Sequence, residues 1–71
     1  MSQFDKIAWH DDKGDPVSCV EKLKVLNETL TELRQIAQDA LEDAVLMGCA
    51  ETQVREVLGS LVDGLNNPYR K

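Results

Sequence analysis

The chain has 71 residues, with thirteen acidic side chains against eight basic ones and a formal net charge of −5. A domain this short buries only about 60% of the surface that its unfolded chain exposes, so it needs a disulfide, a metal or a partner subunit. The acidic balance disfavours attraction to nucleic acid or to anionic lipid and favours basic partners. No apolar run is long enough to span a membrane, and no signal peptide is recognisable, which predicts a cytoplasmic protein.

Residues 1–15 are predicted to form an N-terminal arm, because a short apolar stretch around Trp9 is followed by a polar, turn-prone run. Asp15 followed by Pro16 is a favourable helix start, since Asp can accept bonds from unpaired amides and Pro fits the first helical position. No Gly or Pro follows until Gly48. We therefore expect one long helix over about 16–47, ended by Gly48 in the left-handed conformation.

Apolar residues recur in the long segment at alternating steps of four and three over four heptads, which is typical of a coiled-coil seam. The seam consists of Cys19, Leu23, Leu26, Leu30, Leu33, Ala37, Ala40, Ala44 and Met47. A second amphipathic pattern predicts a short helix over about 51–65, in which Glu51 and Arg55 are suitably spaced for an ion pair. The short connection between the helices predicts an antiparallel helical hairpin, followed by a tail at 66–71.

The predicted short helix is too short to cover the whole seam, so the N-terminal half of the long helix needs another cover. Heptad spacing suits a second copy of the long helix, and two-fold dimers are the commonest assemblies. We expect a single all-α domain over 1–71 that dimerises into an elongated four-helix bundle. This architecture resembles that of Rop-like helical-hairpin dimers, a likeness that implies nothing about function. The expected dimer interface comprises Val20, Leu23, Leu26 and Leu30.

The sequence offers little material for catalysis. His10 is the only histidine, and no glycine-rich elbow or phosphate loop accompanies the serines or cysteines. Cys19 and Cys49 lack metal-ligand spacing, and the run after His10 lacks the calcium-loop pattern. We therefore expect no enzymatic activity, no cofactor and no metal site.

The sequence favours a homodimeric protein–protein interaction module, such as a small adaptor, regulator or inhibitor. Its partner would be a basic protein, bound through an acidic helix face or through the aromatic arm. The candidate partner-binding residues are Trp9, Glu28, Glu32 and Asp39. Two alternatives stay open: a metal- or redox-responsive protein that uses His10, Asp11 and the two cysteines, and an acidic mimic of nucleic acid.

Overall fold

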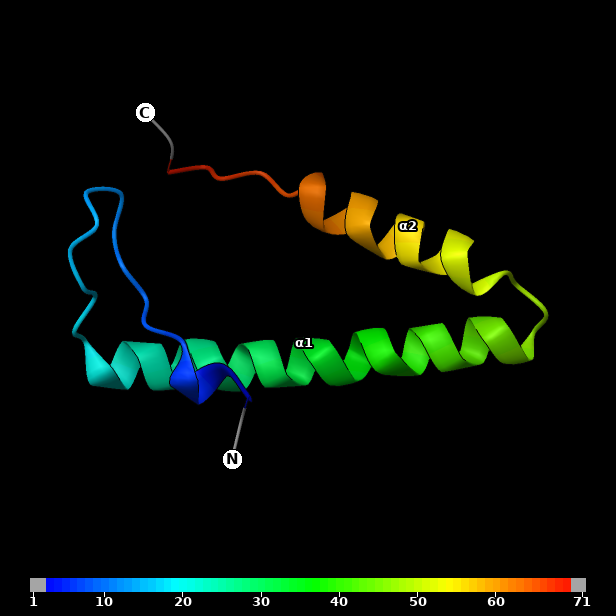
Figure 1. The fold of residues 1–71 in the computed structure, drawn as a ribbon, viewed down its shortest axis with the longest axis horizontal. Coiled ribbons are helices and arrows are strands. Elements are labelled where there is room, and N and C mark those ends of the chain that lie inside the picture. Colours follow the sequence, from blue (N-terminus) through cyan, green and yellow to red (C-terminus); the bar gives the residue numbers. More distant parts are fainter. Residues whose placement is uncertain (1–2, 70–71) are drawn as a thin grey trace. The chain divides into compact units, whose positions relative to one another are not determined.

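The structure is a computed structural model that describes residues 3–69, and these residues are helical apart from turns and short extended stretches (Figure 1). Its elements are a 3₁₀ turn η1 at Gln3–Lys6, a long helix α1 at Val20–Leu46 and a short helix α2 at Glu51–Asp63. The chain divides into two contact units, Met1–Ile36 and Ala37–Lys71. The all-α class and the helical hairpin confirm the predicted fold, and the second unit contains the C-terminal part of α1 together with α2.

The arm is an ordered loop that folds back on itself before α1 begins. Asp11 organises its turn, because one carboxylate oxygen, Oδ1, accepts the amides of Lys13 at 2.9 Å and Asp15 at 3.0 Å. Such a side-chain turn is a common use of aspartate. An isolated antiparallel bridge joins His10 to Pro16, and Gly14 supplies the positive φ of +87° that the reversal needs.

The long helix begins four residues later than the sequence pattern predicts. Pro16 takes part in the bridge with His10, and the amide of Val17 donates to the carbonyl of Trp9 at 3.0 Å. These bonds hold residues 16 and 17 in an extended conformation, so Asp15 and Pro16 do not start the helix. The first helical bond runs instead from the amide of Leu23 to the carbonyl of Cys19.

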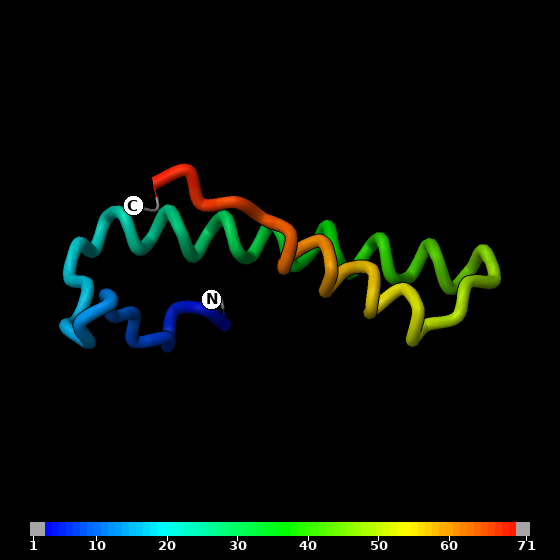
Figure 2. The backbone as a smooth tube through the Cα atoms, turned by 90° about the horizontal axis from the view of Figure 1, so that it is seen from above, coloured from blue at the N-terminus to red at the C-terminus, as the bar shows by residue number. Residues whose placement is uncertain are grey.

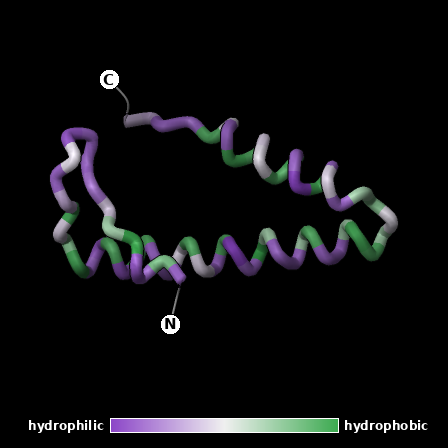
Figure 3. Tube along the Cα trace, in the orientation of Figure 1, coloured by the Kyte–Doolittle hydropathy of each residue, from purple (hydrophilic) through white to green (hydrophobic). Residues whose placement is uncertain are grey.

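From Val20 onward α1 runs without interruption for 27 residues, or about 40 Å, as the absence of Gly and Pro predicts (Figure 2). Apolar residues recur along its whole length (Figure 3). The predicted seam divides into two rows, each with a step of seven residues. The row that is half-buried consists of Leu23, Leu30, Ala37 and Ala44. The row that stays exposed consists of Cys19, Leu26, Leu33, Ala40 and Met47.

The turn after α1 is a Schellman motif centred on Gly48, whose φ of +99° confirms the predicted left-handed stop. The amide of Cys49 donates to the carbonyl of Ala44 at 2.9 Å, and the amide of Gly48 donates to that of Val45 at 3.0 Å. Because this motif satisfies carbonyls at the end of α1 within a very short connection, the chain can turn back at once into α2 (Figure 2).

Within the second unit, the two helices of the hairpin carry complementary half-buried apolar positions. Those on α1 are Ala37, Leu41 and Ala44, and those on α2 are Val54 and Leu58. In the first turn of α2, the predicted pair forms: Nε of Arg55 lies 2.9 Å from Oε2 of Glu51. The helix ends at Asp63, two residues before the predicted end, with Gly64 as its C-cap.

The start of α2 has no side-chain cap, which offers a direct test of this helix boundary. Ala50 occupies the N-cap position and provides no side-chain hydrogen bond. Ala50→Ser would supply a hydroxyl for the amide of Gln53, and the Gln53 side chain could return a bond, completing a capping box. We expect the free energy of unfolding to rise by about 1 kcal/mol, equivalent to roughly 4–8 °C in the melting temperature followed by circular dichroism.

The control for this test combines Ala50→Ser with Gln53→Ala, which removes the reciprocal bond and should lower the gain. Ala50→Val, which adds a side chain without an acceptor, should not stabilise the protein. If the valine variant gained as much as the serine variant, the stabilisation would not come from capping.

Candidate functional sites

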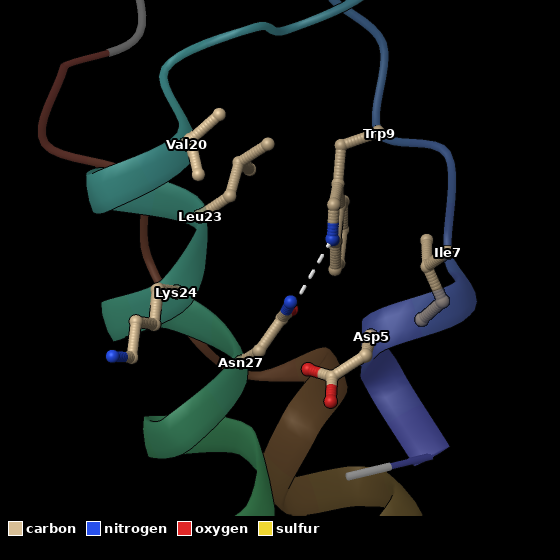
Figure 4. A pocket seen from close by; sticks show the side chains of 7 residues that line it. All are labelled: Asp5, Ile7, Trp9, Val20, Leu23, Lys24 and Asn27. Atoms are coloured by element: carbon tan, nitrogen blue, oxygen red, sulfur yellow. Dashed lines mark hydrogen bonds between the residues drawn. The ribbon is translucent and has the colours of Figure 1, made fainter. Parts of the chain in front are cut away.

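The arm and the first half of α1 together form the most developed site of the first unit. The indole of Trp9 is half-buried, and its Nε1 donates a hydrogen bond of 3.3 Å to Oδ1 of Asn27 (Figure 4). Asn27 is the one buried residue between positions 3 and 69, with 9% of its surface exposed. A buried indole usually finds an acceptor for its N–H group, so this bond fixes where the arm lies on α1.

A cavity of about 430 Å³ lies beside this hydrogen bond, between the arm and α1 (Figure 4). Its lining combines apolar side chains with Asp5 from the arm and Lys24 from α1. The cavity falls in the size range of small-molecule pockets, but it is wide open and shallow. We regard it as the incompletely filled contact between the arm and the helix.

The four residues predicted to form a dimer interface lie on α1 in the first unit, and they differ in exposure. Leu23 and Leu30 are half-buried, and Leu23 lines the cavity with Ile7 and Trp9. Val20 and Leu26 are exposed. Leu33 and Ile36, about two to three turns further along, are also exposed and extend the apolar surface that Leu26 begins.

The acidic residues predicted to bind a partner are exposed along α1. Glu28, Glu32 and Asp39 are spaced by four and seven residues, which places them on one face of the helix. By the same spacing, this face lies opposite the half-buried row that begins at Leu23. The structure thus brings these three carboxylates into one stripe, whereas Trp9 belongs to the arm contact on another side of α1.

A second, shallower hollow of about 340 Å³ lies at the turn end of the hairpin, within the second unit. Its apolar lining comes from the last two turns of α1, and Leu46 is 86% exposed. Carboxylates from both helices border it: Glu42, which accepts a bond of 2.8 Å from Nε2 of Gln38, and Glu51, which pairs with Arg55. The lining residues are Leu41, Glu42, Val45, Leu46 and Glu51.

The residues considered for metal or redox chemistry either make hydrogen bonds within the arm or lie exposed at the surface. The carboxylate of Asp11 holds the arm turn, and Nδ1 of His10 lies 3.1 Å from the backbone oxygen of Asp11. Cys19 and Cys49 are free thiols at the surface. Within residues 3–69, no three His, Cys, Asp or Glu side chains are grouped so that they could hold a metal ion.

Among the same described residues, neither α1 nor α2 has the length and apolar character that crossing a membrane requires. The predicted tail is described only as far as Tyr69, whose amide donates to Oδ1 of Asn67 at 2.9 Å. Arg70 and Lys71 of that tail, like Met1 and Ser2 of the arm, lie outside the described residues.

Sequence reasoning did not identify Asn27 or the hollow at the turn. Two features of the sequence could have indicated this contact. Asn27 is a polar residue within an apolar region of α1, and the indole N–H of a tryptophan in the arm needs a hydrogen-bond acceptor. The hollow depends on where α2 begins relative to α1, and periodicity carries no such information. No protein-family model, curated protein or solved structure matches this chain.

Proposed function

We propose that the chain is a non-enzymatic protein–protein interaction module that works as a homodimer. The observation that supports this most is the exposed apolar row on α1. Its members recur every seven residues, which is the heptad repeat on which coiled-coil contacts between helices are built. Four of the nine predicted seam residues are half-buried within the chain, and the exposed row, which includes Leu26, Leu33, Ala40 and Met47, is left for a second copy.

The described residues give a physical reason for association. No apolar residue between positions 3 and 69 is fully buried, and several large apolar side chains of α1 are exposed, including Val25 and Ile36. Burying a large apolar side chain contributes about 1.5–3 kcal/mol, so a two-fold interface that covers this row on both protomers recovers that free energy twice. Association with another subunit is a usual way to stabilise a small chain that lacks fully buried apolar residues.

The same arrangement leaves the acidic stripe of α1 available to another protein. The stripe and the exposed apolar row lie on different sides of α1, so a dimer joined through the row would still present Glu28, Glu32 and Asp39. A basic protein is the partner that these charges favour. The arm, with Trp9 bonded to Asn27, would serve as internal packing rather than as the docking element.

Analytical ultracentrifugation over a dilution series tests the assembly. We expect the mass of a dimer at high concentration and a concentration-dependent fall towards the monomer mass. A monomer mass throughout the micromolar range would refute the homodimer.

A further inference from the structure

The hollow at the turn end of the hairpin combines an apolar floor with an acidic border. Leu41, Val45 and Leu46 supply the floor from the last two turns of α1, with Leu46 almost fully exposed. Glu42 of α1 and Glu51 at the start of α2 border it. Both carboxylates are oriented by a bond to Oε2, from Gln38 and Arg55, and an ionised carboxylate can accept further donors.

Negative charge predominates around this hollow. Between positions 37 and 69 the chain carries six carboxylates and a single basic side chain, Arg55, which gives this stretch a net charge of −5. Arg55 already pairs with Glu51. Neither α1 nor α2 has a basic residue in its last turn, although the negative end of a helix dipole favours one there. Glu42 and Asp43 instead place negative charge close to the C-terminal end of α1.

We propose that this hollow docks an amphipathic helix of another protein, with apolar residues on one face and Lys or Arg along its edges. The apolar face would cover Leu41, Val45 and Leu46, and the flanking cations would meet Glu42 and Glu51. Helix-in-groove binding of this kind uses apolar anchors at helical spacing. The cations would also supply the positive charge that the end of α1 lacks.

This proposal deepens the interaction-module function by naming a site and the chemistry of its ligand, and it does not depend on the dimer. Ala40 and Met47 of the exposed row lie about 100° or more around α1 from Leu41, Glu42 and Val45. A second copy seated on that row and a basic helix seated on the hollow would therefore use different sides of α1.

Fluorescence anisotropy with a labelled peptide of Leu and Lys, arranged as an amphipathic helix, tests the site on the full chain. We expect saturable binding that weakens with salt, and no binding of the matching Leu and Glu peptide. Leu46→Gln should raise the dissociation constant about tenfold, because it removes a large apolar contact. Since Leu46 is exposed and Gln is a good helix former, circular dichroism should show an unchanged fold.

Two matched controls separate this site from general attraction to an acidic protein. Glu42→Gln should weaken binding about two- to fivefold, whereas Glu21→Gln, which removes the same charge in the first turn of α1, away from both the hollow and the acidic stripe, should leave it unchanged. Leu65→Gln changes an equally apolar, exposed residue outside the hollow and should also have no effect. Equal losses for Glu21→Gln and Glu42→Gln, unchanged binding of the basic peptide to the Leu46→Gln variant, or no binding of that peptide to the wild type would each overturn the proposal.

The two experiments test the docking site and the homodimer independently of each other. Ultracentrifugation reports the self-association of the chain without any peptide, and anisotropy reports the hollow in either assembly state. A monomer that binds the basic peptide would refute the dimer and support the docking site, and a dimer that ignores the peptide would do the reverse.

Discussion

Leu33→Glu is expected to leave the chain folded and to abolish its dimer. Leu33 is 50% exposed and belongs to the apolar row of α1, so a charge there costs the isolated chain little. In a two-fold interface the substitution occurs on both protomers, and each copy would bring an unpaired carboxylate into an apolar contact. The dimer dissociation constant should rise roughly a hundredfold or more, measured by sedimentation equilibrium.

Leu61→Glu is the matched control for that experiment. Leu61 is 58% exposed and lies in the interior of α2, so the change in side chain, charge and exposure is closely comparable. It should leave the monomer–dimer equilibrium within about threefold of the wild type, because an exposed charge away from the interface has little effect. If Leu61→Glu dissociated the dimer and Leu33→Glu did not, the interface would lie on α2, contrary to our proposal.

Trp9→Ala should release the arm from α1 and destabilise the protein by about 2 kcal/mol. The substitution removes a half-buried indole and its bond to Asn27, and it leaves that buried amide without its partner. Full truncation of a buried tryptophan costs about 3–5 kcal/mol, and partial exposure lowers the expected value. Thermal denaturation measures the loss, and faster tryptic cleavage after Lys13 would report the freed arm.

Trp9→Phe distinguishes the contribution of the apolar ring from that of the hydrogen bond to Asn27. It keeps an apolar ring against Leu23 and Ile7 and should cost only about 1 kcal/mol, the usual worth of one hydrogen bond. Tyr69→Ala, which truncates an exposed aromatic side chain, should change neither the melting temperature nor the cleavage rate. Unaltered melting and cleavage in Trp9→Ala would show that the arm contributes nothing to stability.

Local chemistry was sufficient to predict where α1 ends and that it is continuous. Gly48 can adopt the left-handed conformation at no steric cost, and the preceding segment has no Gly or Pro to interrupt it. The same local reasoning failed at the other end of the helix. Asp15 and Pro16 are good starting residues, but pairing of His10 and Trp9 with residues 16 and 17 opposes helix formation there. These contacts join residues six and eight positions apart, and they leave no mark in composition.

The candidate sites show a similar division. Spacing alone placed Glu28, Glu32 and Asp39 on one face of α1, because that inference needs only the helical repeat. The hollow at the turn was not foreseen, since it combines Leu46 at the end of one helix with Glu51 at the start of another. Which residues border such a site depends on how the chain reverses at Gly48.

Periodicity along the chain therefore established two helices of unequal length and one apolar seam, because the helical repeat is a local property of the backbone. It could not establish which half of the seam is covered, since Leu23 and Leu26 are equally apolar and lie on adjacent rows of one broad face. Tertiary packing determines which row is covered: the arm lies against Leu23 beside Asn27, and Leu26 and Leu33 stay exposed to solvent. Contacts between segments distant in sequence select one row over the other.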